Sequence, residues 1–178
     1  MTGSKLMTDR SSAGTKSMNF KTADLCDDHS DKAGIQIAEP IFRSYGKNSA
    51  FSGSITTLKI FEDNSLVRSV LETRVDSRVL VVDGGGSHRC ALLGDNLARL
   101  AVDNGWTGVV VYGCIRDSAD INEMAVGVRA LHTHPLKSRK RGVGEQDIPV
   151  SFASVTFRKD HYIYVDEDGI IVSSEPLA

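Results

Sequence analysis

Three consecutive pieces of the chain decide the fold: Arg78-Val-Leu-Val-Val-Asp-Gly-Gly-Gly86, Leu92-Leu-Gly-Asp-Asn-Leu-Ala98 and Gly108-Val-Val-Val-Tyr-Gly-Cys-Ile-Arg-Asp117. The first contains an uninterrupted run of β-branched and aliphatic residues at 79–82, and the third contains three valines followed by Tyr112. Such runs are typical of strands that are buried on both faces of a sheet. They predict two neighbouring strands in the core of the protein.

The segment between these runs has the spacing of a helix. Leu97 is followed by apolar residues three and four positions later, Leu100 and Ala101, so the three share one face. Asp95 is the expected N-cap, and Gly105 is the expected residue after the helix end. Two strands joined by a helix within about thirty residues form a βαβ unit, which predicts a parallel pair of strands.

The ends of this βαβ unit carry residues that suit a charged ligand. The helix start at 94–97 presents free backbone N–H groups and the positive end of the helix dipole, which favour an anion. Arg116 follows the second strand and offers a planar guanidinium for a carboxylate, and Asp117 offers hard oxygen ligands for a divalent metal. Ligands of open α/β sheets gather at the carboxyl ends of strands, so one site could hold both. The alternative is that Arg116 and Asp117 form an ordinary turn with a helix cap.

The composition is that of one globular domain. The chain has 178 residues, of which 40% are hydrophobic and 25% charged, and its formal net charge is −2. This charge gives no bulk attraction to nucleic acid or to an anionic membrane, so neither is an expected partner. Cys26, Cys90 and Cys114 are odd in number and widely spaced, which indicates free thiols in a reducing compartment.

The two ends of the chain differ in character. Residues 1–19 are rich in Ser, Thr, Lys and Gly, which predicts a disordered N-terminal extension or an expression remnant. Residues 20–178 are expected to form the domain. No apolar run reaches transmembrane length and no signal-peptide pattern occurs, so we expect a cytoplasmic protein.

Periodicity predicts further elements on both sides of the central unit. The expected helices cover 22–28, 66–71 and 118–126, and the expected strands cover 54–61, 128–133, 149–157, 162–165 and 170–173. Thr22 is the expected cap of the first helix, and Asp120 and Glu123 are spaced as a capping box in the last. Strands that alternate with helices predict a single α/β domain with βαβ units and a mixed sheet.

Two further motifs have more than one interpretation. The glycines at 84–86 resemble nucleotide and S-adenosylmethionine loops, but Arg89 stands where a dinucleotide loop needs glycine, and Ser87 where a methyltransferase loop needs it. A tight bend, or backbone close to a ligand, is the favoured interpretation. The basic run at 137–141 is expected to be an exposed loop, with a phosphate or protein contact as the alternative.

One spacing resembles a known family. Asp95, twenty intervening residues and then Arg116-Asp117 match the pattern of the RraA-like family, which includes the regulators of ribonuclease activity A and the class II 4-hydroxy-4-methyl-2-oxoglutarate aldolases. The resemblance runs from roughly residue 22 to residue 177 and includes Glu39-Pro40, Phe61-Glu62-Asp63-Asn64, Val82-Asp83-Gly84-Gly85-Gly86 and Gly142-Val143-Gly144-Glu145. It implies the swivelling β/β/α fold of that family.

The resemblance also implies roles for individual residues. The residues implied to hold a pyruvate-like group are Gly94, Asp95, Asn96, Leu97 and Arg116. Asp117 is implied to bind Mg²⁺ or Mn²⁺, and Asp95 to orient a water on that metal. Glu39 is implied to face the active site of a neighbouring subunit as a proton-transfer residue, within a homotrimer or a hexamer of two trimers.

The expected function is that of a metal-dependent carbon–carbon lyase acting on 2-oxo dicarboxylates. The two candidate reactions are aldol cleavage of 4-hydroxy-4-methyl-2-oxoglutarate and decarboxylation of oxaloacetate, and both leave electrons on a pyruvate enolate that a divalent metal stabilises. The set formed by Asp95, Arg116 and Asp117 contains no lysine, which argues against a Schiff-base aldolase. The alternative, from the same family, is a non-enzymatic regulator that binds and inhibits a ribonuclease.

Overall fold

The computed structural model describes residues 20–178, so the extension expected at 1–19 lies outside the described residues. In chain order the elements are α1 (Thr22–His29), β1 (Ile35–Ile37), β2 (Arg43–Tyr45), β3 (Phe51–Lys59), α2 (Ser65–Leu71), β4 (Arg78–Asp83), β5 (Ala91–Leu93), α3 (Asp95–Asp103), β6 (Trp106–Ile115), α4 (Ser118–Ile121), β7 (Gly127–Thr133), β8 (Glu145–Gln146), β9 (Val150–Phe152), β10 (Val155–Phe157), β11 (Tyr162–Val165) and β12 (Ile170–Ser173). None of the helices in this part of the chain has the length and apolarity needed to cross a membrane.

One mixed sheet of ten strands organises the described residues. Its main path runs β1-β12-β11-β3-β4-β6-β7-β2, while β5 pairs with β6 and β8 pairs with β3. The central strands β3, β4, β6 and β7 are parallel to one another, and the flanking strands are antiparallel. The predicted βαβ unit is confirmed, because β4 and β6 pair in parallel with Val81 opposite Val110 and α3 between them in sequence.

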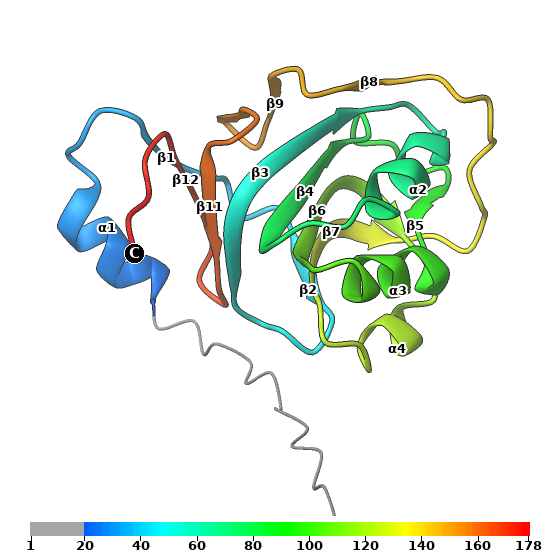
Figure 1. The fold of residues 1–178 in the computed structure, drawn as a ribbon, viewed down its shortest axis with the longest axis horizontal. Coiled ribbons are helices and arrows are strands. Elements are labelled where there is room, and N and C mark those ends of the chain that lie inside the picture. The colour runs from blue at the N-terminus through cyan, green and yellow to red at the C-terminus, as the bar shows by residue number, and fades with distance from the viewer. Residues whose placement is uncertain (1–19) are drawn as a thin grey trace, which may run out of the picture.

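The sheet is covered on both faces. Figure 1 shows α2, α3 and α4 grouped beside β4 to β7, and α1 at the opposite end beside β11 and β12. The helical side packs around Leu80, Val82, Val109 and Val111, whereas the opposite face of the same strands packs on the β9–β10 hairpin. Because β4 and β6 alternate into two cores, their central positions are apolar on both faces, as the sequence runs predicted.

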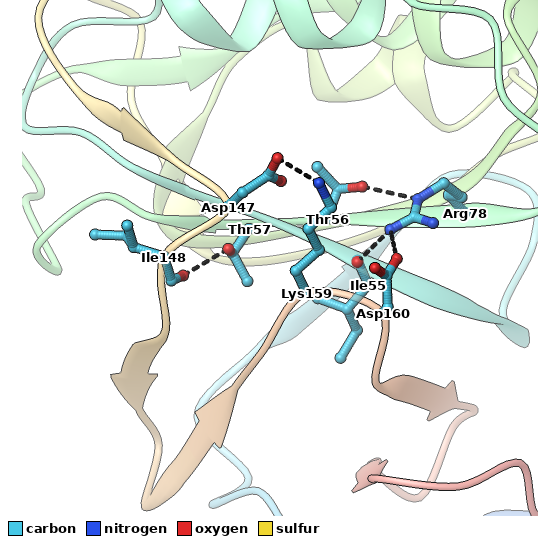
Figure 2. Close-up of polar contacts among 8 residues, drawn as sticks. All are labelled: Ile55, Thr56, Thr57, Arg78, Asp147, Ile148, Lys159 and Asp160. Carbon is cyan, nitrogen blue, oxygen red and sulfur yellow. Dashed lines mark hydrogen bonds and ion pairs between the residues drawn. The ribbon is translucent and has the colours of Figure 1, made fainter.

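Polar contacts fasten the later segments to β3 and β4 (Figure 2). The backbone N–H of Asp147 donates to the carbonyl oxygen of Thr57 at 2.9 Å, and the Asp147 carboxylate lies 2.6 Å from the Lys159 ammonium. Arg78 of β4 pairs with Asp160 at 2.8 Å. These contacts join the segment after β8 and the turn before β11 to the centre of the sheet.

Two helix starts differ from the sequence prediction. Asp95 was the expected N-cap, but it is the first residue of α3, and Gly94 precedes it with extended backbone and no side-chain cap. Thr22 is likewise the first residue of α1, and its hydroxyl donates instead to Asp166 Oδ1 at 2.6 Å. Both N-cap predictions are therefore wrong. For Thr22 the reason is a tertiary hydrogen bond, because its hydroxyl is engaged by Asp166 and not by its own helix.

The helix expected at 118–126 is shorter than predicted. It ends at Ile121, and Asp120 lies inside it, so the capping box with Glu123 does not form. Asp117 occupies the N-cap position in the left-handed conformation, with φ of 54°. Glu123 instead lies 3.4 Å from the Lys47 ammonium, and β7 begins at Gly127.

The strand expected at 149–157 is a hairpin of two strands. Ala153 and Ser154 form its two-residue turn, with φ of 51° and 61°. Positive φ at both turn positions is the geometry of the tight hairpin turn, which Asn and Gly favour. Ala and Ser gave no such signal, so the turn was missed. The short strands β1, β2, β5 and β8 were also not predicted.

Candidate functional site

The three-residue strand β5 brings the two strand ends of the site together. It pairs in parallel with β6, and the backbone N–H of Arg116 donates to the carbonyl oxygen of Leu93 at 2.9 Å. Since both strands end at the same edge, the start of α3 lies beside the residues that follow β6. The backbone nitrogen of Asp95 is 3.4 Å from Asp117 Oδ2.

Gly94 makes this approach possible. A Cβ at this position would lie 2.8 Å from Asp117 Oδ2 and 3.4 Å from Arg116 Nε. The backbone of Gly94 is extended, with φ of −127°, so the glycine is required by space and not by conformation. The side chains of Arg116 and Asp117 occupy the volume that any other residue would fill.

A pocket of about 1100 Å³ opens at this edge. All five residues expected to hold the substrate line it: Gly94, Asp95, Asn96, Leu97 and Arg116. Asp117 is beside the pocket and does not line it. The first turn of α3 has backbone N–H groups without intrahelical partners, so this wall of the pocket can accept an anion.

The Asp117 carboxylate suits a small hard cation. Its side chain is 36% exposed and lies 3.4 Å from Arg116 Nε, so it is solvated and not sealed in a dry ion pair. Within residues 20–178 no group of three or more His, Cys, Asp or Glu side chains gathers as a ready metal cage. Mg²⁺ is commonly held by one or two carboxylates together with water and substrate oxygens, and this donor set fits that pattern.

Glu39 lies apart from the pocket within one chain. It follows β1, an edge strand far from β5 in the order of the sheet (Figure 1), and it does not line the pocket. Its backbone N–H donates to the carbonyl oxygen of Ala153, and its carboxylate accepts a hydrogen bond from Ser154. Within one copy of the chain, Glu39 therefore does not contribute to this pocket.

Sequence reasoning missed two walls of the pocket. Residues from 62 to 68, at the start of α2, and the segment 136–141 both line it. The basic run at 137–141 is a largely exposed loop as predicted, but nothing in its local pattern places it opposite α3. The pocket also contains Lys137 and Lys140, so the absence of lysine from the set of Asp95, Arg116 and Asp117 does not extend to the whole pocket.

Asp63 holds these two walls together. Its Oδ1 accepts hydrogen bonds from the backbone N–H and hydroxyl of Ser65, at 2.9 and 2.6 Å. Its Oδ2 accepts from the backbone N–H groups of Arg141 and Val143, at 2.8 and 3.1 Å. Burial raises the pKa of Asp63, but the hydrogen bonds from Ser65, Val143 and Arg141 outweigh it and lower the pKa to about 2.

The glycine loop after β4 is a tight bend away from the pocket. Gly85 and Gly86 have φ of 67° and 68°, which agrees with the tight-bend interpretation. A Cβ at Gly85 would lie 2.8 Å from the Phe61 ring, and one at Gly86 would lie 3.1 Å from the Tyr112 ring. None of the three glycines lines the pocket.

The chain has close relatives over nearly its whole length. The family model described as RraA-like, Aldolase/RraA, matches residues 22–172. A protein of Methylococcus capsulatus is 61% identical over 160 residues, which are 90% of this chain and 99% of that protein. Its name gives 4-hydroxy-4-methyl-2-oxoglutarate aldolase as a provisional assignment.

Two solved structures share the fold. One is named S-adenosylmethionine:2-dimethylmenaquinone methyltransferase from Geobacillus kaustophilus, with 49% identity and a TM-score of 0.86, over 89% of this chain and 97% of that chain. The other is named the RNA-processing inhibitor RraA from Thermus thermophilus, with 43% identity and a TM-score of 0.85, over 89% and 95%. The family model and these relatives agree over the same residues, and the chain belongs to the RraA-like family.

Proposed function

We propose that the protein is a divalent-metal-dependent carbon–carbon lyase: a 4-hydroxy-4-methyl-2-oxoglutarate aldolase that also decarboxylates oxaloacetate. One observation carries this proposal. The amides at the start of α3, the Arg116 guanidinium and the Asp117 carboxylate meet at one edge of the sheet, beside one pocket. The aldolase names of relatives that match nearly the full length support it.

The chain's own groups hold the 2-oxo acid in place. The Asp95 N–H already donates to Asp117 Oδ2, so the N–H groups of Asn96 and Leu97 are the ones open to a ligand. These N–H groups and the fork of Arg116 suit a carboxylate, and all three residues line the same pocket. Two such anchors on one carboxylate restrict its rotation. The carbon–carbon bond that breaks is then held in one orientation, which lowers the entropic part of the barrier.

In this proposal Asp117 binds the metal and Asp95 directs the proton transfer. Asp117 would hold Mg²⁺ or Mn²⁺ at the edge of the pocket. When bound, such a cation supplies Lewis-acid stabilisation of the negative charge that develops as the carbon–carbon bond breaks. Asp95 lines the pocket, where it can orient a water and direct a proton to the product carbon.

A Schiff-base mechanism is the chemical competitor, because Lys137 and Lys140 line the pocket. Schiff-base lysines are activated by desolvation or by a neighbouring cation in an apolar pocket. Lys137 and Lys140 are both exposed, so they lack the desolvating, apolar surroundings that such activation requires. This setting favours the metal route.

The test is pyruvate release from oxaloacetate and from 4-hydroxy-4-methyl-2-oxoglutarate, before and after chelation and with Mg²⁺ or Mn²⁺ restored. We expect activity to vanish on chelation and to return with metal. Asp117→Ala should abolish it, and Asp103→Ala, which removes an exposed acid at the end of α3, should not. Full activity after exhaustive chelation, or inactivation by borohydride in the presence of substrate, would contradict the proposal.

One structural relative is named as a methyltransferase, but we do not propose methyl transfer for this protein. The glycines at 84–86 pack against Phe61, Leu92 and Tyr112 and leave the pocket wall to other residues. We therefore expect no tight binding of S-adenosylmethionine by calorimetry.

A second candidate function is regulation of a ribonuclease. The 43% identity with the RNA-processing inhibitor of Thermus thermophilus favours it. Such a role requires a protein-binding surface and not a metal, so Asp117→Ala should leave it intact. Capture of the host ribonuclease, with inhibition of its cleavage by wild type and by this variant alike, would support a regulator. If Asp117→Ala loses pyruvate release but still inhibits the ribonuclease, the two functions are separate.

Assembly and location are part of the proposal. We propose a homotrimer, or a hexamer of two trimers, in which Glu39 reaches the pocket of a neighbouring copy as a second proton-transfer residue. Its place outside its own chain's pocket supports this arrangement. We also propose a cytoplasmic location, in keeping with the buried free thiols of Cys90 and Cys114.

A further inference from the structure

The pocket carries far more positive charge than one carboxylate needs. Seven of the side chains that line it are basic and two are acidic. The basic ones are Arg68, Arg89, Arg116, Lys137, Arg139, Lys140 and Arg141, and the acidic ones are Glu62 and Asp95. Such an excess, focused in one hollow, attracts and orients anions.

The unpaired part of this charge lies on one loop. Three of the basic side chains already have carboxylate neighbours: Arg68 with Glu72, Arg89 with Glu62 and Arg116 with Asp117. The other four are those of the 137–141 loop, and none of them forms a salt bridge with an acidic side chain of residues 20–178. Their guanidinium and ammonium groups are therefore available to a ligand.

The backbone of this loop is held in place while its charged side chains are free. Besides the two bonds from Arg141 and Val143 to Asp63, the backbone N–H of Arg139 donates to the carbonyl oxygen of Glu62 at 3.1 Å. Ser138 is buried, and its hydroxyl accepts a hydrogen bond from the backbone N–H of Asn64 at 3.1 Å. A loop fixed in this way presents its cations without first paying the full entropic cost of ordering.

The substrate class offers a matching group. A 2-oxo dicarboxylate has one carboxylate next to the 2-oxo group, which Arg116 and the α3 amides take in the proposed function. Its second, distal carboxylate lies beyond the bond that breaks and needs a cation elsewhere in the same pocket. The four unpaired cations of the 137–141 loop line that pocket.

We propose that the 137–141 loop binds the distal carboxylate of the substrate, and that Asp63 is the positioning residue that holds this loop at the pocket. This inference rests on the proposed function for the orientation of the substrate. The two can fail separately, because the loop's preference can be measured by binding without turnover.

The experiment compares two probes of the same chain length, 2-oxoglutarate and 2-oxopentanoate. They differ only in ending with a carboxylate or with a methyl group. Calorimetry on the full chain with Mg²⁺ gives the ratio of their dissociation constants. A charged hydrogen bond at a partly exposed site should favour 2-oxoglutarate by about tenfold or more.

Variants that remove charge from the loop then show which side chains cause the preference for 2-oxoglutarate. The double variants Arg139→Gln/Arg141→Gln and Lys137→Gln/Lys140→Gln keep the backbone N–H groups that anchor the loop. At least one should bring the ratio to within about threefold of one, since the charged partner is lost. The matched control is Arg74→Gln, at an exposed arginine outside the pocket, which should leave the ratio unchanged.

Asp63→Asn tests the positioning role. An amide cannot accept the four hydrogen bonds of the carboxylate, so the loop should loosen. We expect weaker binding of 2-oxoglutarate and a change of less than about twofold for 2-oxopentanoate, a split that a general loss of structure would not produce. Asp103→Asn, at the exposed end of α3, is the control.

Equal or undetectable binding of both probes by wild type would overturn the inference, and so would an unchanged ratio in both double variants. Pyruvate release from oxaloacetate without any preference would leave the lyase standing and remove the distal site. A clear preference for 2-oxoglutarate without any turnover would leave the distal carboxylate site standing and remove the lyase proposal. Equal weakening of both probes by Asp63→Asn would remove the positioning role alone, because the loop variants test the site independently.

Discussion

At the scale of single residues, the site depends on one absent Cβ. Gly94 leaves room for Asp117 Oδ2 and Arg116 Nε at the start of α3. A glycine between a strand and a helix has several ordinary explanations, and its sequence neighbours do not distinguish among them. Here the reason is the approach of two side chains that lie more than twenty residues further along the chain.

Gly94→Ala is expected to damage the site without unfolding the protein. The new Cβ would lie 2.8 Å from Asp117 Oδ2, and the obstructing atom is the end of a movable side chain. The carboxylate should shift, which should lower kcat/KM for oxaloacetate by about tenfold to hundredfold. Steady-state kinetics and a thermal melt check this. Gly169→Ala is the control, because a Cβ there meets nothing within 4 Å.

Arg116→Ala is expected to weaken binding of the substrate carboxylate. The guanidinium contributes a charge-assisted and bidentate contact, so its loss should raise the KM for oxaloacetate by about tenfold or more. Arg74→Ala, at an exposed position outside the pocket, should have no effect. Unchanged kinetic constants in Arg116→Ala would show that the clamp role is wrong.

At the scale of elements, short segments decide the site. The strand β5 has three residues, and its pairing with β6 sets the α3 start beside Arg116. The loop 137–143 contains no helix or strand beyond one isolated β-bridge between Lys137 and Ala91, and Asp63 fastens it to the start of α2. Both are held by contacts with distant parts of the chain, so their own residues carry little sign of them.

The Asp63 anchor predicts a particular response to acid. The pKa of this carboxyl is lowered from 3.8 to about 2, so its stabilising effect is present above the unfolded pKa of about 4. It is lost as the pH falls through the folded value. The free energy of unfolding of wild type should exceed that of Asp63→Asn by about 2 kcal/mol at neutral pH.

This difference should shrink as the pH falls from about 5 to about 2, as urea unfolding at several pH values can measure. Asp166, whose pKa is also lowered, contributes to the slope in both proteins and cancels in the comparison. A difference that stays constant across the acid range would show that Asp63 acts by shape and not by charge.

At the scale of the whole molecule, one buried arginine joins separate parts of the fold. Arg129 of β7 is 4% exposed, and its guanidinium donates to the carbonyl oxygens of Ser49 and Asp166, at 2.6 and 2.9 Å, and to the Ser44 hydroxyl at 2.7 Å. These bonds link β7 to β2, to the segment before β3 and to the β11–β12 turn. Burial lowers the pKa of Arg129.

Arg129→Met is expected to destabilise the fold by about 2–4 kcal/mol, because it removes the donor to the buried carbonyl oxygen of Asp166 and the one to the carbonyl oxygen of Ser49. Urea unfolding measures this change. Arg158→Met, at an exposed position in the turn before β11, should change stability by less than about 0.5 kcal/mol. A loss in Arg129→Met no larger than in this control would mean that the carbonyl oxygens find other partners.

The assembly proposal predicts that two inactive variants restore each other. If Asp117 and Glu39 meet only across copies, then mixing Asp117→Ala with Glu39→Gln subunits creates some sites with both wild-type residues. Random mixing in a ring should restore roughly a quarter of the sites. Pyruvate release after co-refolding measures this recovery. No recovery, in a confirmed mixed trimer, would place the two residues in separate roles.

Several features of this protein were determined by its sequence alone. The short, largely β-branched runs at 79–82 and 109–112 favour strands covered on both faces, and the helix between them follows from spacing. The spacing of Asp95 from Arg116-Asp117, together with the other matching motifs along the chain, indicated the family. These signals are local or depend on a fixed count of residues, so the chain displays them without being folded.

Tertiary structure alone decided what surrounds those residues. Three features depend on partners far away in the chain. They are the pairing of β5, the hairpin turn at Ala153 and Ser154, and the position of the basic loop opposite α3. A short strand gains its stability from its neighbour, and an exposed loop gains its place from hydrogen bonds to a distant carboxylate. Neither leaves a periodic pattern, because the energy that fixes it is not contained in its own residues.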